Sequence, residues 1–376
     1  MIPFNKPYFH GKELSYIHQA ITNGKISGDG DFTNKCHDFF EKKYGFKKVL
    51  LTTSCTDALE MAAILLDIQP GDEVIAPSYT FVSTVNAFVL RGANIIFADS
   101  YSDHPNIDPI QIKKLITSKT KAIVVVHYAG VACEMDEIMA IANKNNIPVV
   151  EDAAQAIDSY YKDRPLGSIG AFGTFSFHET KNIIAGEGGL LAINDEKYIQ
   201  RAEIIREKGT NRSSFFRGEV AKYGWVDIGS SFLASDIIAA YLYAQLENIE
   251  LIQSRRKSIW NRYYNKLNNN LNDSGIKLPK IVASSTNNAH MFYLTCKDIG
   301  QRSALIQYLR GNGIYSVFHY LSLHKSEYYQ YKHSGFSLPN SDFFSDSLIR
   351  LPFFYELTDE QIDYITDKII EFTNNQ

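Results

Sequence analysis

Short apolar runs alternate with amphipathic segments from about residue 47 to residue 193 of the chain. Short runs rich in Val, Ile and Leu are typical of buried strands, and apolar residues at helical spacing predict the helices between them. The expected strands are "KVLLT", "EVIAPS", "NIIFAD", "KAIVVVHY" and "PVVEDA", and the expected helices are "DALEMAAILLD", "FVSTVNAFVLRG", "IQIKKLIT" and "EIMAIANKNN". This alternation predicts an α/β fold with a mostly parallel sheet and helices on its faces.

Two later runs, "TFSFH" and "GLLAIN", predict further strands of the same sheet. In open α/β sheets, ligands bind beyond the carboxyl ends of the strands. The loops expected to carry a site are therefore those after Thr52, Ala76, Val126, Val150 and Phe177.

The second half of the chain has a different pattern. From about Phe232 to Asn268 the apolar spacing is helical, and it predicts a long helical segment that bridges two domains. The remainder mixes short strands such as "HMFYLTC" and "YSVFHY" with helices such as "RSALIQYLRGNG" and "DEQIDYITDKIIEFT". We therefore expect a large domain over residues 1–250 and a small α+β domain over residues 251–376.

Length and composition are those of a globular protein. A chain of 376 residues with 45% hydrophobic and 21% charged residues can bury a large core. A net charge of -4 without a block of like charge argues against nucleic-acid binding and favours a small-molecule partner. The segment "MIPFNKPYFHGKEL" lacks a signal-peptide pattern, and no apolar run reaches membrane-spanning length. We expect a cytoplasmic protein without a membrane contact.

The cysteines also limit the classes of protein. They lie far apart without a C-x-x-C pair, which argues against a disulfide framework and against a metal site of the zinc type. We expect buried, reduced thiols at Cys36, Cys55, Cys133 and Cys296.

Candidate chemistry begins after the first two strands. Ser54, Cys55 and Thr56 precede a predicted helix, where free N–H groups and the helix dipole form an anion site; the alternative is a plain N-cap. Tyr79 and Phe81 follow the next strand, where an aromatic face can stack on a flat heterocycle; the alternative is a core position.

A carboxylate and a lysine follow two later strands. Asp152 ends a buried strand, where it needs a cation such as a protonated pyridine nitrogen; a helix cap or an arginine partner are the alternatives. Gln155 lies one helical turn further on. Ser176 and Lys181 precede the glycine-rich "GEGG", and the alternative for Lys181 is a solvated loop lysine. Together with the anion site and the aromatic side chain, these residues are the parts that a pyridoxal phosphate site requires.

The motifs "EDAAQA", "FSFHETKN" and "GEGG", in this order and spacing, resemble the DegT/DnrJ/EryC1/StrS sugar aminotransferase family. The resemblance covers essentially the whole chain. It implies the fold type I architecture of pyridoxal phosphate enzymes, which is that of aspartate aminotransferase. It also implies that Lys181 forms a Schiff base with the cofactor and that Asp152 pairs with the pyridine nitrogen. The residues that the resemblance assigns to the cofactor are Cys55, Thr56, Phe81, Asp152, Gln155, Ser176, Lys181 and Ser231.

The position of Ser231 bears on the oligomer. Many family members carry an asparagine there, in "GYNYRMSD", which reaches the cofactor phosphate of the neighbouring subunit, whereas this chain has "GSSFLASD". The resemblance thus implies a homodimer with shared active sites.

Five further residues are candidates for the substrate. His178, Tyr320 and His324 resemble positions of the family's sugar pocket, although a structural role is an equal alternative for each histidine. Arg212 and Arg217 suit a nucleotide diphosphate, because a forked guanidinium matches phosphate; exposed loop arginines without a ligand are the alternative.

Further motifs, including "TSCTDALEMAA", "PSYTFVST" and "DIGSSF", are similar to members that aminate a dTDP-linked keto sugar. The resemblance implies transfer of an amino group from L-glutamate to C4 of dTDP-4-dehydro-6-deoxy-D-glucose, giving dTDP-4-amino-4,6-dideoxy-D-galactose. The gluco epimer and a 3-amino sugar are alternatives. Two other classes are less well supported: dehydrases carry a histidine in place of Lys181, and non-catalytic regulators carry a basic helix-turn-helix segment ahead of the first strand.

Overall fold

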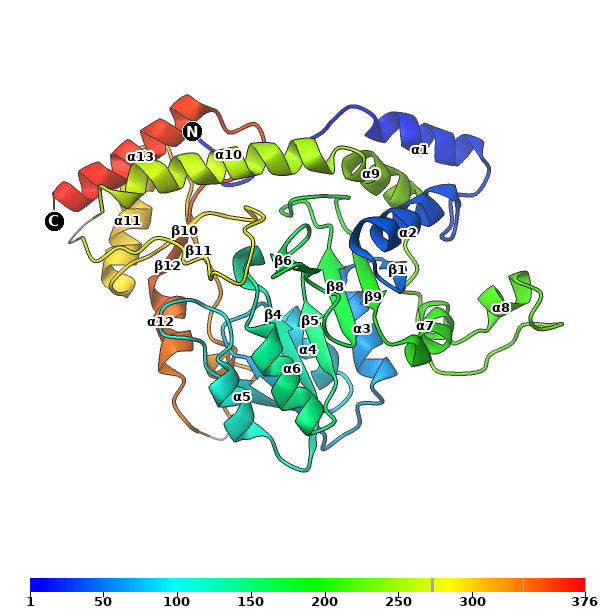
Figure 1. Cartoon of the computed structure of the whole chain (residues 1–376). Coiled ribbons are helices and arrows are strands. Elements are labelled where there is room, and N and C mark those ends of the chain that lie inside the picture. The colour runs from blue at the N-terminus through cyan, green and yellow to red at the C-terminus, as the bar shows by residue number, and fades with distance from the viewer. Residues whose placement is uncertain (272–273, 334, 376) are drawn as a thin grey trace.

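The predicted strands of the first half form one seven-stranded sheet in the computed structural model, which describes residues 1–271, 274–333 and 335–375 (Figure 1). The strand order is β1-β9-β8-β5-β4-β2-β3, and β9 alone runs against its neighbours, so the prediction of a mostly parallel sheet is confirmed. The strands are β1 (Lys48–Thr52), β2 (Glu73–Pro77), β3 (Asn94–Ala98), β4 (Thr120–Val126), β5 (Val149–Asp152), β8 (Phe172–Ser176) and β9 (Gly189–Ile193).

Helices cover both faces of this sheet. Alternate strand residues face opposite layers: Val49 and Leu51 join one buried cluster, and Leu50 between them joins the other. The first layer contains α2 (Asp31–Tyr44), α5 (Pro109–Leu115), α6 (Met135–Lys144) and α9 (Asp236–Leu246), and the second contains α3 (Cys55–Leu65), α4 (Ser83–Val89) and α7 (Ile199–Arg206). The N-terminal helix α1 (Glu13–Thr22) packs on α9.

The long helical segment predicted over residues 232–268 is two helices. The helix α9 ends at Leu246, and α10 (Ile249–Asn268) begins after Asn248. From there α10 runs beside α13 (Asp359–Asn374) along the upper edge of the molecule (Figure 1). The apolar spacing continues across the break, so it did not predict where the first helix ends.

The C-terminal part has its own core and its own sheet, with strand order β10-β12-β11. The predicted mixture of short strands and helices is confirmed. Its elements are β10 (Tyr293–Thr295), α11 (Ile299–Gly311), β11 (Val317–Phe318), α12 (Pro339–Ser347) and β12 (Leu348–Arg350). The remaining short elements of the chain are η1 (Tyr128–Gly130), β6 (Tyr160–Tyr161), β7 (Arg164–Pro165), η2 (Glu196–Tyr198), α8 (Arg212–Phe216) and η3 (Leu323–Lys325).

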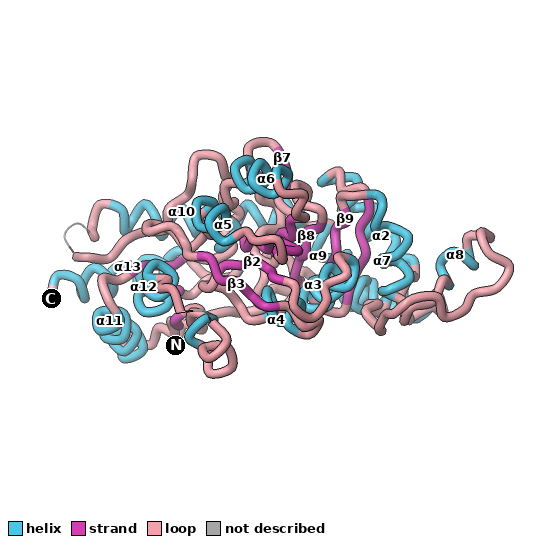
Figure 2. The backbone as a smooth tube through the Cα atoms, turned by 90° about the horizontal axis from the view of Figure 1, so that it is seen from below, coloured by secondary structure: helices cyan, strands magenta, loops and turns pink. Residues whose placement is uncertain are grey.

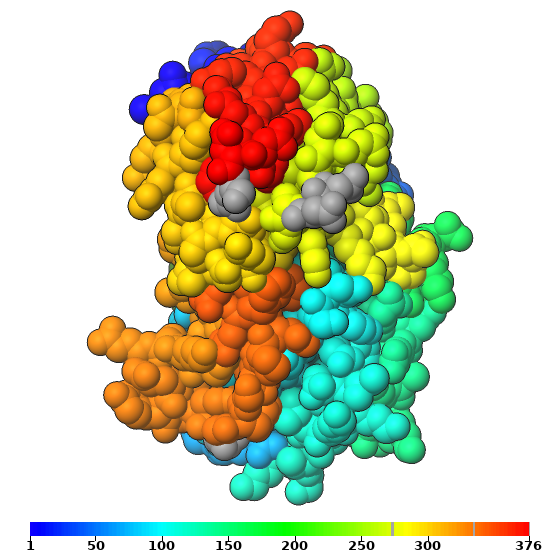
Figure 3. All heavy atoms as spheres, turned by 90° about the vertical axis from the view of Figure 1, so that its left-hand side faces the viewer, coloured from blue at the N-terminus to red at the C-terminus, as the bar shows by residue number. Residues whose placement is uncertain are grey.

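The connection from β11 to β12 crosses onto the large sheet, where Figure 3 shows it in orange beside the cyan layer. The hydroxyl of Tyr329 accepts a hydrogen bond from the Ile95 N–H at 2.6 Å. The carboxylate of Asp99 accepts hydrogen bonds from the backbone N–H groups of Asn340 and Ser341. These bonds hold the connection along the edge strand β3, from its second residue to the residue that follows its carboxyl end.

An arm formed by residues 208–231, which includes α8, projects from the opposite end of the molecule (Figures 1 and 2). It exposes large apolar side chains, with 83% of Trp225 and 70% of Phe216 accessible. Among the described helices, none combines the length and the apolar character of a transmembrane span. All four cysteines are free and buried, as predicted.

Candidate active site

A cavity of about 430 Å³ opens at the carboxyl edge of the large sheet. The loops after Thr52, Ala76, Val150 and Phe177 contribute to its lining, and β4 contributes its last residue, Val126, because the carboxyl ends of the parallel strands meet at this edge. The cavity brings together most of the predicted site residues, namely Cys55, Thr56, Phe81, Asp152, Gln155, Ser176, His178, Lys181 and Tyr320.

One end of the cavity is an anion cradle. Ser54 caps α3, since its hydroxyl accepts the Asp57 N–H at 3.0 Å, and the N–H groups of Cys55 and Thr56 have no acceptor within the helix. The N-cap interpretation is therefore confirmed, and it is compatible with the anion site, which stays a prediction. Gly189 of β9 passes so closely that a Cβ there would lie 2.4 Å from the Cys55 nitrogen. Lack of a side chain at Gly189 thus allows the cradle to form.

Asp152 is a buried carboxylate without a counter-ion. Its oxygens accept a hydrogen bond from the Thr84 hydroxyl at 2.7 Å and one from the Ala154 N–H at 3.1 Å. Burial raises the pKa of Asp152, and these two hydrogen bonds oppose the rise. No arginine of the described residues forms an ion pair with this carboxylate, so a cation from a ligand would be stabilised beside it.

Lys181 lies in the turn that follows β8, where its N–H donates to the carbonyl of His178 at 2.9 Å. Burial lowers the pKa of the Lys181 amine, and nearby Cys55 and Asp152 oppose this effect. The lysine is therefore not the solvated loop residue of the alternative interpretation. Its amine is a nucleophile and base that faces the cavity.

Part of the cavity wall comes from the C-terminal part of the chain. Gln155 donates from its amide nitrogen to the Tyr320 hydroxyl at 3.0 Å and accepts the Ala129 N–H at 2.6 Å. Tyr320 has a φ of 50°, a left-handed conformation that is rare for a residue with a side chain. Sequence reasoning missed several lining residues, namely Ser83, Thr84, His290, His319 and Arg350.

Four predicted residues lie outside this cavity. His324 is buried and does not line the cavity. Its Nδ1 lies 2.7 Å from the Ser78 hydroxyl, and this contact links the β11–β12 connection to the end of β2. Arg212 and Arg217 lie on the arm, where they pair with glutamates at 3.3 and 2.9 Å. Ser231 is exposed at the base of the arm. The structure thus supports the structural alternative for His324, and it places the other three away from their own chain's cavity.

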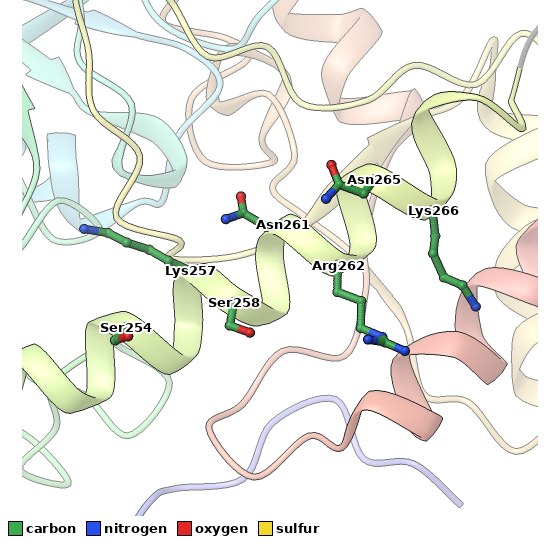
Figure 4. Close-up of a pocket in the computed structure, with 7 residues that line it drawn as sticks. All are labelled: Ser254, Lys257, Ser258, Asn261, Arg262, Asn265 and Lys266. Atoms are coloured by element: carbon green, nitrogen blue, oxygen red, sulfur yellow. The ribbon is translucent and has the colours of Figure 1, made fainter.

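A second hollow follows the outer face of α10 (Figure 4). Its basic side chains Arg262 and Lys266 turn towards α13 and pair there with Asp363 at 2.6 and 3.0 Å. Neighbouring side chains such as Ser258 and Asn261 are exposed and point away from each other. This hollow is lined by α10 alone, whereas the first cavity brings together polar groups from several strands and loops.

The fold and the arrangement of these groups define a transferase of the fold type I class. The chain belongs to the DegT/DnrJ/EryC1/StrS aminotransferase family, whose sequence profile matches residues 7–370.

Solved structures agree with this assignment. Spr1654 from Streptococcus pneumoniae in its PMP form is 26% identical and superposes over 100% of both chains with a TM-score of 0.92, and its PLP form has a TM-score of 0.90. The aminotransferase TlmJ from Streptoalloteichus hindustanus is 26% identical, with a TM-score of 0.91 over 100% of this chain and 99% of that one. PseC of Helicobacter pylori, an aminotransferase of pseudoaminic acid biosynthesis, shares the fold at 23% identity, with a TM-score of 0.91 over 100% of both chains.

Proposed function

We propose that the protein is a pyridoxal phosphate-dependent transaminase that moves the amino group of L-glutamate to C4 of dTDP-4-dehydro-6-deoxy-D-glucose, giving dTDP-4-amino-4,6-dideoxy-D-galactose. The observation that carries the proposal is one cavity that holds the Lys181 amine, the uncompensated Asp152 carboxylate and the anion cradle. Family membership supports the aminotransferase chemistry, and the PLP and PMP forms of Spr1654 support the cofactor. The sugar rests on the motif resemblance.

The residues of the cavity fit this cofactor. Pyridoxal phosphate, when bound, supplies an aldehyde that joins amines and a ring that accepts electrons. The N–H groups of Cys55 and Thr56 bind its phosphate, and Asp152 stabilises a proton on its ring nitrogen. Lys181 Nζ would hold the cofactor, and its neutral amine would be the base that takes a proton from the carbon that carries the donor's amine. Burial favours the neutral amine that this step needs.

The configuration at C4 depends on which face of the keto carbon meets Lys181 Nζ. Protonation from the opposite face gives the gluco epimer, and a sugar bound one carbon round gives a 3-amino product. A non-catalytic regulator is a weaker alternative, because Lys181 and Asp152 would then lie in one cavity without a use.

We propose a homodimer as the working form, in the cytoplasm. The exposed apolar side chains of the arm are suited to cover by a second copy. Ser231 at the base of the arm is exposed and lies outside its own chain's cavity, which agrees with a role in the neighbouring subunit's site.

The direct test is incubation of the enzyme with L-glutamate and the 4-keto sugar nucleotide, with the configuration of the product assigned from NMR coupling constants. We expect the galacto product. The variant Lys181→Ala should lose both turnover and the visible absorbance of the lysine-bound cofactor. Undiminished transamination by this variant would contradict the proposal.

A further inference from the structure

His290 presents one ring nitrogen to the active-site cavity without a hydrogen-bond partner. The residue lies in the segment that leads into β10, is 3% exposed and lines the same cavity as Lys181. Its Nδ1 lies 2.8 Å from Asn182 Oδ1. In the described part of the chain no group bonds to Nε2, and this atom is not among the fully buried polar atoms that lack a partner, so it is open to the cavity. A polar atom placed in this way is available to a ligand.

The hydrogen bonds of Asn182 determine which ring nitrogen of His290 carries the hydrogen. The backbone carbonyl of Asn288 only accepts, and it lies 2.8 Å from Asn182 Nδ2, so this end of the amide is the nitrogen. The same nitrogen donates to Gln253 Oε1 at 2.9 Å. The other end of the amide is therefore the oxygen, which only accepts. The hydrogen between Asn182 and His290 thus belongs to Nδ1, and Nε2 of the neutral ring has a lone pair.

The surroundings of His290 keep the ring neutral. Burial lowers the pKa of His290 well below its ordinary value, and the nearby charges of Lys181 and Arg350 lower it further. Among the described residues, no carboxylate forms an ion pair with the ring that would stabilise its charged form. Nε2 can therefore accept a hydrogen bond from a ligand, and it cannot donate one.

An acceptor of this kind discriminates between the groups of the proposed substrates. Carboxylates, phosphates and the keto oxygen only accept hydrogen bonds, so none of them can pair with Nε2. L-Glutamate otherwise brings its amine, which is the group that reacts. The keto sugar brings hydroxyl groups, which can donate. A neutral hydroxyl also suits a place near the two cations Lys181 and Arg350 better than an ammonium group does.

We propose that His290 Nε2 accepts a hydrogen bond from the C3 hydroxyl of the keto sugar, which makes His290 a specificity-determining residue of the sugar half-reaction. This assignment rests on the proposed function. The reacting carbon, C4, must come within reach of Lys181 Nζ, and the side chain of the next residue, Asn182, is bonded directly to the His290 ring. Of the two carbons next to C4, C3 carries a hydroxyl and C5 carries the methyl group. The C3 hydroxyl is thus the donor beside the reacting carbon.

Two substitutions separate the roles of the two ring nitrogens. The longer amide of Gln can place an acceptor where Nε2 lies, whereas the amide of Asn reaches only the position of Nδ1. His290→Gln therefore keeps an acceptor in the cavity, and His290→Asn keeps a partner for Asn182 but loses that acceptor. With dTDP-4-dehydro-6-deoxy-D-glucose, kcat/KM should fall about 10- to 100-fold in His290→Asn and less than about threefold in His290→Gln.

The 3-deoxy analogue of the sugar nucleotide tests the hydroxyl itself, because it lacks the donor. The wild type should prefer the parent sugar by about 10- to 100-fold in kcat/KM, since the analogue leaves Nε2 unpaired. His290→Gln should keep this preference, and His290→Asn should use both sugars nearly equally. A merely structural role of His290 would lower kcat/KM for both sugars by the same factor and leave the preference unchanged.

A further readout does not depend on turnover. The ligand dTDP-6-deoxy-D-glucose lacks the keto group and cannot be aminated, so its binding to the enzyme can be measured by calorimetry. Its affinity should fall about tenfold in His290→Asn and stay close to that of the wild type in His290→Gln. The single-turnover reaction with L-glutamate should change less than about threefold in both variants, because glutamate offers no hydroxyl.

The outcomes are distinguishable. If the wild type aminates neither sugar, the proposed function fails, and the assignment of His290 fails with it. If the wild type aminates both sugars with equal kcat/KM, or if His290→Asn keeps the preference, the assignment of His290 fails while the proposed function stands. Equal losses in both half-reactions, in His290→Gln and His290→Asn alike, would show that His290 only supports the cavity wall, and would also overturn the assignment.

Discussion

At the scale of single residues, burial favours the neutral forms of both Asp152 and Lys181, which are the protonated carboxyl group and the deprotonated amine. Burial raises the pKa of Asp152 and lowers the pKa of Lys181, and each carries a charge of the sign that favours the other's ionised form. A ring with a protonated nitrogen restores the charge of Asp152, while Lys181 remains available as a neutral amine. The two residues thus require the cofactor for different reasons.

Asp152→Asn tests the first of these reasons. Replacing the carboxylate by an amide removes the charge at nearly constant shape, so we expect a loss of roughly a thousandfold in kcat, as for other lost electrostatic contacts in active sites. The control is Thr84→Val, which keeps the charge of Asp152 but removes the 2.7 Å hydrogen bond to Asp152 and the 2.9 Å hydrogen bond to Thr80, and it should cost about tenfold. A kcat of Asp152→Asn within about tenfold of wild type would reduce Asp152 to a helix cap.

The pH dependence of cofactor attachment tests the second reason, which is that Lys181 is available as a neutral amine. The neutral Lys181 amine attacks the aldehyde, so attachment to the apoprotein should decline as the pH falls through the lowered pKa of Lys181 rather than through the ordinary lysine pKa. Asp152 raises this pKa and Arg350 lowers it. The midpoint should therefore move to lower pH in Asp152→Asn and to higher pH in Arg350→Gln. Rates of pyridoxal phosphate binding to apoprotein, measured against pH, give both midpoints, and shifts of the same sign would contradict this view.

At the scale of elements, the cradle depends on the contact between β9 and the start of α3. A methyl group on Gly189 would lie 2.3 Å from the carbonyl carbon of Ser54, so the backbone of the cradle would have to move. We expect Gly189→Ala to weaken pyridoxal phosphate binding about 10- to 100-fold, because phosphate contacts are charge-assisted. Spectroscopic titration of apoprotein measures this.

The neighbouring glycine provides the control. A Cβ on Gly188 would meet Phe177 at 3.5 Å, an ordinary contact, so Gly188→Ala should bind the cofactor like the wild type. If both variants bind equally, the close approach of β9 does not shape the cradle.

The elements also show how far sequence reasoning reaches. Apolar spacing predicts the strands and most helices, and the fold places residues such as Asp152 and Lys181 after strands that meet at one edge. Apolar spacing does not predict that His319 and Arg350 reach the cavity. They come from the C-terminal part of the chain, and the local sequence does not determine how that part packs against the seven-stranded sheet. The contact of His324 has the same origin, since its partner Ser78 directly follows β2 of the seven-stranded sheet.

At the scale of the whole molecule, the arm projects from the body (Figures 1 and 2), and none of its residues lines its own chain's cavity. The charges of Arg212 and Arg217 are partly compensated by glutamates of the arm and of α7, while Trp225 and Phe216 are exposed. Apolar exposure of this kind favours association. A dimer through this arm would bring Ser231 and the two arginines towards a second copy's cavity, so their distance from their own site is compatible with the roles predicted from the sequence.

Subunit mixing tests whether Ser231 acts between subunits. In a hybrid dimer of Lys181→Ala and Ser231→Arg chains, one site would combine the intact Lys181 of one chain with the intact Ser231 of the other. Because a 1:1 mixture gives about half hybrids with one working site each, we expect up to about a quarter of wild-type activity from two inactive parents. Ser231→Ala alone should weaken pyridoxal phosphate binding by about 1–3 kcal/mol without dissociating the dimer. If Ser231 served its own chain's site, the mixture would stay as inactive as either parent, since every site would then lack either Lys181 or Ser231.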